Sequence, residues 1–420
     1  MNKERKNKTI KKTISDTRER HSYMDCRTYE VKVVGSKLSR SQKDQVNQYF
    51  REAKWLRNFI IADLENANRD AKSVIVKIGN DFEERTLEIL GSQVKQDIYD
   101  KVRSEIKGLS TKKKQGYKIG TLKFKSYCNS IPLRQLGKTY YIDRDHNRVR
   151  IQNIRKPFYV RGLKQIPEDA EFANAKMIRK ASGLYFHITV FEPKHEVQVT
   201  NKSIGIDFGI ENNLTLSDGA VYNITIPESK SVKLASRRKS RSYIKNGRKH
   251  SHRDRKRRQL LARAYERDMN KRQDMANKIC HILIKEYDFI AIQDEMIHNW
   301  HSGLFGKQVQ HSSMGSIKAK LKTNSKTHVI GRSFPSTQVC PVCGCLTKHP
   351  LSKRDYDCPE CGYHHNSRDQ KSAQSILEEA LRQVSMEHRT QSLVEAESTA
   401  SVSQDTECKI PPMKREAHVL

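Results

Sequence analysis

Two Cys-x-x-Cys pairs near the C-terminal end of the chain restrict its possible folds more than any other feature. Cys340 and Cys343 form the first pair, and Cys358 and Cys361 form the second. A Cys-x-x-Cys turn directs two thiolates at one point, and a glycine directly after each pair lets the backbone bend beneath a metal. A redox dithiol needs one pair rather than two, so a metal site is the better interpretation. The spacing therefore predicts one structural Zn²⁺ ion with a closed shell of four sulfur ligands.

Three neighbouring side chains are alternative ligands for that ion. Cys345 lies just after the first pair, and His364 and His365 follow the second pair. Because four cysteines already complete a tetrahedral shell, we do not expect these three residues to bind the metal.

The chain is also strongly basic. It contains 80 lysine and arginine residues against 48 acidic ones, which gives a net charge of +32 over 420 residues. Such a field attracts polyanions, and nucleic acid is favoured over an anionic membrane because no apolar run approaches the length of a bilayer-spanning helix. The basic N-terminus lacks the apolar core of a secretory signal, and the other cysteines are scattered as in cytosolic proteins. We therefore expect a cytoplasmic protein that binds nucleic acid and no membrane.

Hydrophobic periodicity divides the N-terminal half into alternating strand-like and helical segments. In chain order we expect a mobile basic arm over residues 1–22, a strand over 29–33, helices over about 39–64 and 84–107, a Lys- and Gly-rich loop over 110–120, and strand-forming patches between 121 and 198. This order predicts a β-rich module that is interrupted by a helical insert.

The C-terminal half begins a new module near residue 201. In chain order we expect a strand over 204–208, a hairpin over 214–224, a basic helix that ends near 286, a strand over 288–295, a loop and helix over 303–321, a strand over 327–334, and a disordered tail over 386–420. The tail is poor in apolar residues, which is typical of segments that cannot form a core.

A dense basic tract precedes residue 286. Its acidic residues are too few for regular i,i+4 ion pairs, so a phosphate partner is favoured over a solvated helix face. The candidate nucleic-acid-binding residues of this tract are Arg237, Arg238, Lys239, Arg253, Arg257 and Arg258.

Three acidic residues occupy positions from which a shared site can be built. Asp207 lies between two glycines on one face of a predicted strand, which leaves room for a close approach. Glu295 ends the apolar strand over 288–295 and shares a face with Gln293, because side chains alternate with a period of two. Asp369 lies in the first turn of the helix that follows the cysteine pairs. Each has an ordinary structural explanation by itself, as a turn residue, a solvated strand end or a helix cap.

Taken together, these features resemble the TnpB family of transposon-encoded, RNA-guided nucleases and, more distantly, the compact type V CRISPR effectors. The similar motifs, within about residues 25–380, are Gly205-Ile-Asp-Phe-Gly209, Gln293-Asp-Glu295, Trp300 with Phe305-Gly-Lys307, Phe334 to Gly344, Cys358 to Gly362, and Asp369 to Ala373. The resemblance implies an α+β multidomain fold. It comprises a β-barrel-like wedge module over 23–37 and 108–198, a helical recognition lobe over 38–107, an RNase H-like (RuvC-like) α/β nuclease domain over 199–335 and 365–385, and an inserted zinc ribbon over 336–364.

The resemblance also assigns roles to the three acids. Asp207 and Asp369 match the first and third acids of the family's nuclease site. The second motif usually reads Glu-Asp-Leu, and Gln293 stands where that glutamate stands. Glu295 lies on the same strand face, roughly 6–7 Å further along, so we assign the second acid to Glu295. The three carboxylates would hold two Mg²⁺ ions, since hard cations prefer oxygen ligands.

The function implied by the resemblance is RNA-guided cleavage of DNA. The protein would bind a guide RNA, partly through Lys123 and Lys125 of the wedge module, and cut matched double-stranded DNA beside a short flanking motif by two-metal hydrolysis. It would act at the nucleoid of a prokaryotic cell. Three alternatives stay open: a guided binder that does not cleave, motivated by Gln293; a protein-only transposase or resolvase; and a zinc-ribbon RNA-binding protein with incidental carboxylates. The number of protomers per guide RNA is open as well.

Overall fold

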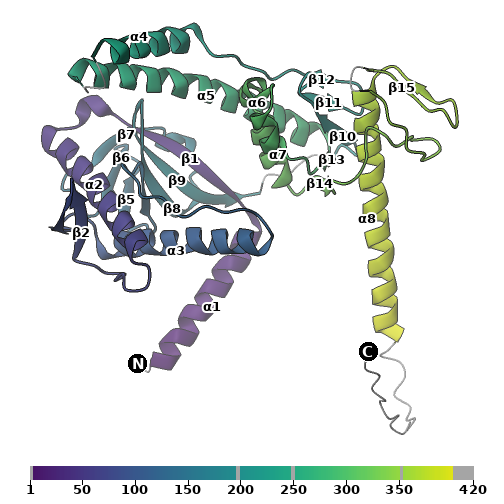
Figure 1. Cartoon of the computed structure of the whole chain (residues 1–420). Helices are drawn as coiled ribbons and strands as arrows, with labels where there is room; N and C mark the ends of the chain where they lie inside the picture. Colours follow the sequence, from purple (N-terminus) through teal and green to yellow (C-terminus); the bar gives the residue numbers. More distant parts are fainter. Residues whose placement is uncertain (1–2, 195–198, 247–250, 351–352, 401–420) are drawn as a thin grey trace, which may run out of the picture. The chain divides into compact units, whose positions relative to one another are not determined.

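The computed structural model describes residues 3–194, 199–246, 251–350 and 353–400, with side chains over 12–194, 199–241, 251–350 and 353–386 (Figure 1). The chain divides into two compact units, Met1–Glu196 and Val197–Leu420. Each unit has its own hydrophobic core, as expected of separate folding units. Within the described residues, no helix combines the length and the apolar character that crossing a bilayer requires.

A seven-stranded sheet forms the framework of the first unit, in the order β4-β8-β9-β1-β7-β6-β5. Its strands are β1 (Met24–Val33), β4 (Ser130–Leu133), β5 (Tyr140–Asp143), β6 (Arg148–Ile151), β7 (Phe158–Arg161), β8 (Glu171–Lys180) and β9 (Gly183–Pro193). Neighbouring strands are antiparallel, and β1 pairs with β9 along most of its length and with β7 at its end, so the sheet curls into a nearly closed barrel. The predicted barrel-like sheet is confirmed, although residues 122–124, predicted as a strand patch, have no regular structure.

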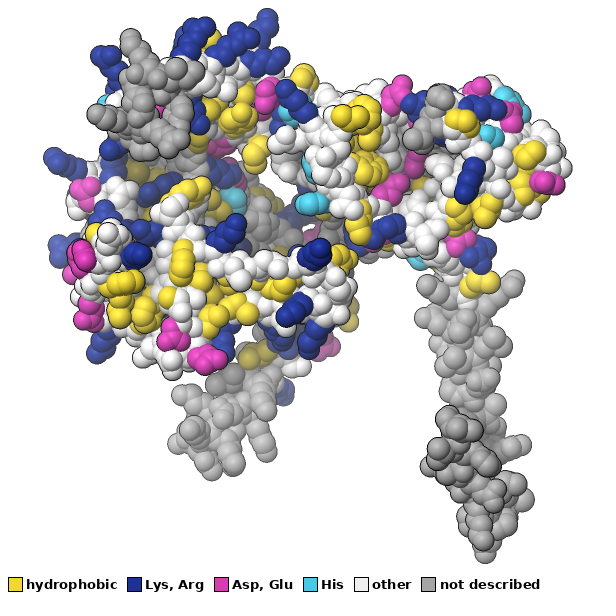
Figure 2. All heavy atoms as spheres, in the orientation of Figure 1, with side chains coloured by type: hydrophobic (Ala, Val, Ile, Leu, Met, Phe, Trp, Pro, Cys, Tyr) yellow, Lys and Arg dark blue, Asp and Glu magenta, His cyan; other side chains and the backbone are white. Residues whose placement is uncertain are grey.

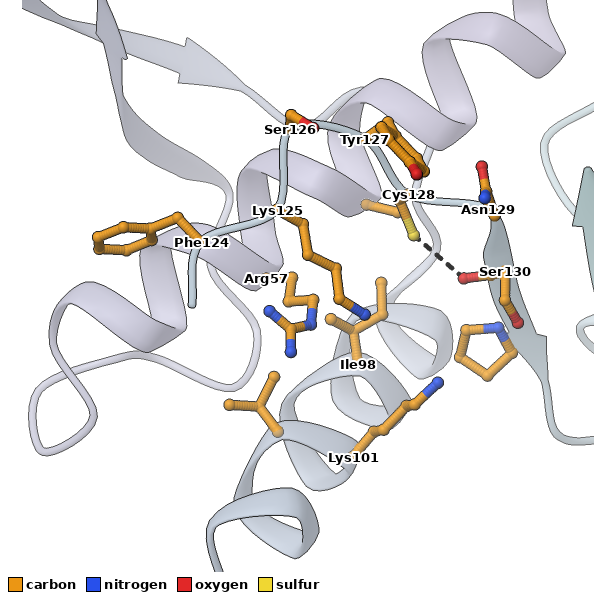
Figure 3. Close-up of a pocket in the computed structure, with 13 residues that line it drawn as sticks. Arg57, Ile98, Lys101, Phe124, Lys125, Ser126, Tyr127, Cys128, Asn129 and Ser130 are labelled. Carbon is orange, nitrogen blue, oxygen red and sulfur yellow. Dashed lines mark hydrogen bonds between the residues drawn. The ribbon is translucent and has the colours of Figure 1, made fainter. Parts of the chain in front are cut away.

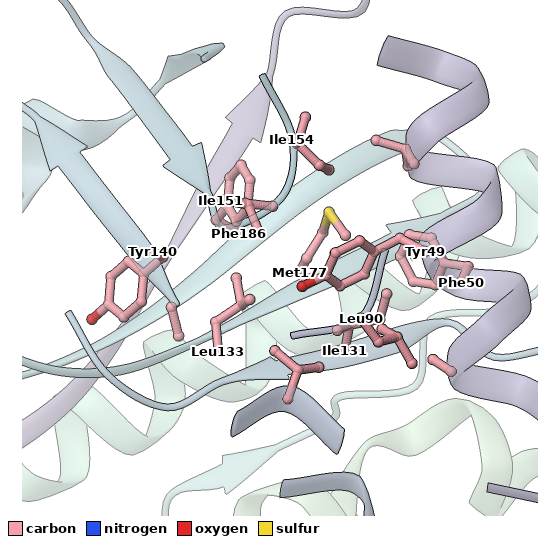
Figure 4. Close-up of a cluster of buried hydrophobic side chains, with 14 of the residues drawn as sticks. Tyr49, Phe50, Leu90, Ile131, Leu133, Tyr140, Ile151, Ile154, Met177 and Phe186 are labelled. Atoms are coloured by element: carbon pink, nitrogen blue, oxygen red, sulfur yellow. The ribbon is translucent and has the colours of Figure 1, made fainter. Parts of the chain in front are cut away.

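The core of this unit lies between the sheet and helix α2 (Arg40–Ala62) (Figure 4). Ile131 of β4, Met177 of β8 and Phe186 of β9 meet Tyr49 of α2, and all four side chains are completely buried. Phe158 of β7 lies edge-on to Phe186, with 5.7 Å between the ring centroids. The burial of this apolar surface is what holds the helix on the sheet.

Local hydrogen bonds fix the start of α2 and the position of the segment that precedes the next long helix. Ser39 and Gln42 form a reciprocal capping box, in which each side chain accepts a hydrogen bond from the other residue's backbone N–H. Further along α2, the buried carboxylate of Glu52 accepts hydrogen bonds from the backbone N–H groups of Ile89 and Leu90 at 3.0 and 3.1 Å. These bonds hold the segment that leads into the second long helix of the insert.

The insert between β1 and β4 is not purely helical, contrary to the prediction. After α2 it contains β2 (Ser73–Ile78), β3 (Asp81–Thr86) and α3 (Ser92–Lys114). Residues 84–86, predicted as the start of the second helix, belong to β3, and α3 extends into the predicted loop over 110–120. A turn at Gly79, with φ of +66°, joins the two strands of this hairpin.

The N-terminal segment, predicted as a mobile basic arm, forms helix α1 (Lys3–Ser22). The last turn of α1 contacts the barrel. The ring of His21 stacks on Phe191 of β9 with 3.6 Å between the centroids, and Arg20 and His21 contact Glu171 of β8 at 2.9 and 3.0 Å. These contacts join residues far apart in the chain, so the local composition gave no sign of them.

A five-stranded mixed sheet forms the centre of the second unit, in the order β12-β11-β10-β13-β14. Its strands are β10 (Ser203–Phe208), β11 (Leu214–Leu216), β12 (Val221–Tyr222), β13 (Phe289–Gln293) and β14 (Thr327–Ile330). The first three along the chain form an antiparallel meander, whereas β13 runs parallel to β10 and β14 runs parallel to β13. The predicted strands are therefore confirmed, with β13 and β14 shorter than expected.

Helices cover both faces of this sheet. Helices α5 (His252–Glu286) and α7 (Met314–Lys322) pack on the face that carries Ile204 and Ile206. Helix α8 (Arg368–Ala400) packs on the face of Gly205. A Cβ atom at Gly205 would lie 2.0 Å from the carbonyl oxygen of Ala373, so only glycine lets α8 approach β10 this closely. The close approach predicted from the two glycines is thus made at Gly205 by a helix backbone.

Two other predictions for this unit need correction. The basic tract forms two helices, α4 (Lys230–Asn246) and α5, rather than one, and the residues between 247 and 250 lie outside the described part. Residues 386–400 continue α8, so the prediction of a disordered tail is wrong for them, and residues 401–420 lie outside the described part. The segment predicted as loop and helix contains α6 (Gly306–Ser312) and α7 after a short 3₁₀ helix over Ile297–Ser302.

Candidate metal sites and nucleic-acid surfaces

The four predicted cysteines come together in one cluster. The sulfur atoms of Cys340, Cys343, Cys358 and Cys361 all lie within 4.8 Å of one another, and no other group of three or more His, Cys, Asp or Glu residues does so in the described part of the chain. The backbone turns after each pair pass through glycines with φ of +73° and +72°, a conformation that favours glycine. This geometry suits a single tetrahedral ion.

The alternative ligands have other neighbours. His364 contacts Asp357 at 2.6 Å and Asn366 at 2.7 Å, and His365 accepts a hydrogen bond from the backbone N–H of Ser367. Cys345 lies closer, with its sulfur 3.1 Å from that of Cys358. This contact, the main cause, lowers the pKa of the Cys358 thiol to about 6, which favours the thiolate form that a metal needs.

The three predicted acids also converge. Asp207 lies near the end of β10 and is 8% exposed. Burial raises the pKa of Asp207 well above its usual value, and the negative charges of Glu295 and Asp369 raise it further. The carboxylates of Glu295 and Asp369 are therefore close enough to act on Asp207. Like charges that are held together in this way are typical of a site that binds cations.

Glu295 reaches this site from beyond the end of its strand. Strand β13 ends at Gln293, and the chain then bends, with the backbone N–H of Glu295 donating to the carbonyl oxygen of Gln293 at 2.9 Å. Burial raises the pKa of Glu295 to about 7, and the ammonium of Lys318 opposes this shift. The Oε2 atom of Glu295 is buried and has no hydrogen-bond partner among the described residues. An orphaned carboxylate oxygen of this kind suits a cation ligand.

Asp369 approaches from the first turn of α8. Its Oδ2 atom accepts a hydrogen bond from Asn212 at 3.3 Å and lies 3.7 Å from the guanidinium of Arg354. Two basic residues of the same helix turn, Arg368 and Lys371, lower the pKa of Asp207 and so oppose the effect of the other acids. The acid cluster is thus bordered by positive charge on the α8 side.

The remaining polar residues of the second motif point elsewhere. Asp294 faces away, as predicted, and lies 3.3 Å from both Lys318 and Lys322. Gln293 is buried, and its amide is bonded to the segment that leads into the cysteine cluster. Gln293 therefore has no free group to offer to a metal, and the local pattern of the sequence gave no sign of these long-range bonds.

The predicted basic residues of α4 and α5 lie on the surface. Figure 2 shows lysine and arginine side chains projecting from the region of these helices. All six are exposed except Arg257, which is half-buried, and Arg258 is paired with Asp254 at 2.9 Å. A hollow of about 230 Å³ between the helices is lined by Arg238 and Arg257, by Arg263 of the same predicted basic tract, and by Arg267, which was not predicted.

A second basic hollow lies in the first unit, beside the segment that contains Lys123 and Lys125 (Figure 3). Its volume is about 400 Å³, and three cations line it, Arg57, Lys101 and Lys125. Lys123 is exposed but does not line the hollow. The side chain of Asn58 holds the backbone N–H and C=O of Lys125 at 2.9 Å each, so this segment is fixed on α2.

Aromatic rings flank this hollow. Phe124 and Tyr127 both line it, yet they are 64% and 67% exposed. None of the described residues that line the hollow is acidic. Exposed rings beside unpaired ammonium groups are typical of surfaces on which single-stranded nucleic acid stacks. The alternation of basic and aromatic residues from Lys123 to Tyr127 was the available signal in the sequence.

The second unit thus defines a class of protein: an α/β unit with three converging acids, in which a four-cysteine cluster lies between the second and third acid along the chain. Comparison with known proteins agrees with this order. Residues 186–299, which include Asp207 and Glu295, match the family model OrfB_IS605, described as a probable transposase. Residues 313–376, which include the four cysteines and Asp369, match the model described as Cas12f1-like, TNB domain.

A curated relative extends the comparison. A protein of Streptomyces pristinaespiralis named putative RNA-guided DNA endonuclease is 28% identical over 234 residues, which is 54% of this chain and 57% of the relative. The match therefore spans little more than half of the relative's length. These matches bear out the resemblance to the TnpB family.

Proposed function

We propose that this protein is an RNA-guided DNA endonuclease, which cleaves DNA matched to a bound guide RNA beside a short flanking motif. The observation that carries the proposal is the convergence of Asp207, Glu295 and Asp369 from three separate elements. The two matched family models and the name of the Streptomyces relative support it. The net charge of +32 supports guide RNA and double-stranded DNA as partners.

The nuclease domain of this proposal is RNase H-like, of the RuvC type, and comprises residues 199–335 and 365–385. Its support is the order of the central sheet, in which an antiparallel meander is followed by two strands parallel to the first. This order brings the end of β10 and the end of β13 to the same edge of the sheet, because both strands run in the same direction. The first turn of α8 then supplies the third acid.

Asp207, Glu295 and Asp369 would hold two Mg²⁺ ions, because both other acids act on Asp207 and all three carboxylates are therefore near one another. When bound, such ions activate an attacking water and stabilise the leaving 3′-oxygen. The chain's own contribution is to bury Asp207, to present the unbonded Oε2 of Glu295, and to restrain Asp369 through Asn212. These groups fit hard cations, which prefer carboxylate oxygens.

The four cysteines would hold one structural Zn²⁺ within a ribbon over residues 336–364. Their closed set leaves no position for a reacting water, so zinc would serve the fold rather than the chemistry. In the first unit, the wedge module over 23–37 and 108–198 and the recognition lobe over 38–107 would hold RNA and DNA. Phosphates would contact Lys123 and Lys125 there, and the basic residues of α4 and α5 would form a separate phosphate-binding surface on the second unit.

A guided binder that does not cleave is the second candidate. It is favoured by Gln293, whose amide is fully engaged and stands where the family has its second acid. A protein-only transposase is the third candidate, and the description of the matched family model favours it. The candidates differ in two observable properties, namely strand cleavage and its dependence on RNA.

The test is to purify the protein from cells that carry its native locus, sequence the RNA that is bound, and assay cleavage of a matched plasmid with and without Mg²⁺. We expect RNA-dependent cleavage that Asp207→Ala abolishes while plasmid binding stays within about threefold. Asp294→Asn is the matched control, because it removes a neighbouring carboxylate that faces away from the site. Guide-dependent binding without cleavage would instead identify the binder, and cleavage that survives RNase treatment would identify the transposase.

A further inference from the structure

We propose that Gln293, Ser336 and Lys371 form a buried polar clamp that ties the cysteine cluster to the strand and the helix that carry the second and third acids. Through this clamp, zinc at the cysteines would set the affinity of the acids for divalent metal. The inference rests on the proposed function, because it assumes that both sites bind metal. It makes Gln293 a positioning residue rather than a vestige of a lost acid.

The first part of the clamp is the amide of Gln293. Its Nε2 group donates hydrogen bonds to the carbonyl oxygens of Gly331, Arg332 and Phe334 at 3.3, 3.2 and 2.6 Å. Its Oε1 atom accepts a hydrogen bond from the hydroxyl of Ser336 at 2.9 Å. Both ends of the amide therefore hold the segment that joins β14 to the cysteine cluster.

This arrangement requires an amide rather than a carboxylate. Gln293 is 5% exposed, so water cannot replace a lost partner. A glutamate at this position would direct an oxygen at three carbonyl oxygens and offer them no hydrogen in its charged form. Burying an acceptor against acceptors leaves all of them unsatisfied, which costs far more than a single surface hydrogen bond contributes.

The second part is the ammonium of Lys371. The side chain is completely buried, and its Nζ atom donates to the carbonyl oxygen of Ser336 at 2.9 Å. The same Nζ atom lies 4.1 Å from the ring centroid of Tyr356, a cation–π contact in a dry environment. Tyr356 packs with Cys340 and Cys358 in one small core. Lys371 therefore contacts the cysteine cluster from helix α8.

Ser336 joins the two parts. Its hydroxyl bonds to Gln293, two residues before Glu295, and its carbonyl oxygen bonds to Lys371, two residues after Asp369. Ser336 is itself 5% exposed, so this link is shielded from water. Within the described residues, the clamp thus connects the cysteine cluster to β13 and α8 through a short path of buried hydrogen bonds.

A linkage between the two metal sites follows from this path. Without a metal, the cysteine cluster has only a small core to hold it, so the segment around Ser336 loses its restraint. When this segment is no longer restrained, Gln293 and Lys371 lose their hydrogen-bond partners, and Glu295 and Asp369 can move apart. Because binding linkage is reciprocal, zinc should raise the affinity of the acids for a divalent ion, and that ion should slow the release of zinc.

The test uses the full chain without RNA and measures two quantities: the rate of zinc release to a colorimetric chelator, and the affinity for Mn²⁺ by electron paramagnetic resonance. For Gln293→Glu we expect zinc release at least fivefold faster and Mn²⁺ binding at least threefold weaker than in the wild type. Gln308→Glu is the matched control, because its amide donates to one carbonyl at the surface, and both quantities should stay within twofold.

Hydrogen exchange then locates the effect. Removal of zinc should increase exchange over residues 331–336, 293–296 and 369–372, besides the cysteine cluster itself. If Gln293→Glu does not fold, Ser336→Ala, which deletes one hydroxyl, should produce the same changes at smaller size. Exchange confined to residues 338–365, or a variant with wild-type zinc release and Mn²⁺ affinity, would overturn the proposal. Neither measurement uses cleavage, so a protein that is clamped but does not cut DNA would refute only the proposed function.

Discussion

Glu295 lies beside Asp207 and raises its pKa, although the strand that leads to Glu295 ends two residues earlier at Gln293. The bend after β13 therefore does what a continued strand was expected to do, and it delivers a carboxylate to the edge where β10 also ends. The amide at Gln293 and the acid at Glu295 have separate tasks in this arrangement. One holds the segment after β14, and the other borders the acid cluster.

The burial of the Glu295 carboxylate predicts a pH-dependent stability. The pKa of Glu295 is raised from 4.5 to about 7, so the folded state favours its protonated form. Its contribution to stability is therefore complete below about pH 4.5 and is lost as the pH rises through 7. In the absence of divalent ions, Glu295→Gln should stabilise the protein by about 1–3 kcal/mol at pH 8 and by little at pH 5.

Thermal unfolding of wild type and variant at both pH values, in buffer without Mg²⁺ and without chelator, checks this prediction. Added Mg²⁺ should then raise the midpoint of the wild type more than that of the variant. Glu286→Gln, an exposed position, is the control and should change nothing. Equal midpoints for wild type and Glu295→Gln at pH 8 would mean that the Glu295 carboxylate is not buried as described.

The close approach of α8 to β10 predicts that Gly205 tolerates no side chain. A Cβ atom there would lie 2.0 Å from the carbonyl oxygen of Ala373 and 2.9 Å from Cβ of Leu377, so the helix must move. Gly205→Ala should destabilise the second unit by about 1–3 kcal/mol, as overpacking of a core does. Asp369 lies on the displaced helix, so the affinity for Mn²⁺ should fall in the same variant.

Gly315→Ala is the control for this substitution. It lies in α7, where a Cβ atom would meet nothing within 4 Å, so alanine should be neutral or stabilise by about 0.5–1 kcal/mol. Urea unfolding of the two variants measures the contrast. A Gly205→Ala protein as stable as the wild type would contradict the packing of α8 described above.

The parts of the site that the sequence predicted are those with a local signature. The two Cys-x-x-Cys pairs have a fixed spacing, and Asp207 and Asp369 lie in short motifs. Glu295 was assigned from an expected alternation on a strand that in fact ends at Gln293, and a bend brings Glu295 to the acids instead. The cysteine spacing and the two short motifs involve residues within a few positions of one another, whereas the roles of the acids came from the resemblance to the TnpB family.

The parts that the sequence did not predict depend on distant contacts. Strand β3 reads Asp-Phe-Glu-Glu-Arg-Thr and is exposed along its whole length, so it has no apolar face to recognise. Helix α1 is positioned by His21 against Phe191, on a strand formed much later in the chain. The role of Gln293 depends on carbonyl groups that follow the next strand. No local pattern encodes any of these three relationships.

The cysteine cluster predicts a difference between Cys345 and its neighbours. Cys343 belongs to the group whose sulfurs lie within 4.8 Å of one another, whereas Cys345 contacts Cys358 from outside that group. Cys343→Ser should lose the zinc and expose the small core around Tyr356, and Cys345→Ser should retain one zinc per chain. Elemental analysis of the purified variants measures the stoichiometry. Loss of zinc in Cys345→Ser, with zinc retained in Cys343→Ser, would mean that Cys345 binds the ion and Cys343 does not.

The hollow in the first unit predicts where single-stranded nucleic acid binds. Lys101 and Lys125 have no acidic partner among the described residues, and Tyr127 exposes most of its ring beside them. Each lysine-to-alanine substitution should lower the slope of log affinity against log salt by about 0.7 for a single strand. Tyr127→Ala should weaken binding roughly 5- to 150-fold, because it removes one stacking platform worth about 1–3 kcal/mol.

Fluorescence anisotropy with a labelled ten-nucleotide RNA, and with DNA of the same sequence, measures both effects on RNA-free protein. Lys138→Ala and Tyr23→Ala are the controls, because both residues are exposed in the same unit but do not line the hollow. A lost stacking contact should weaken binding at every salt concentration without changing the slope, whereas a lost phosphate contact should change the slope. If Tyr127→Ala changed the slope alone, the ring would support the backbone of this segment rather than stack on a base.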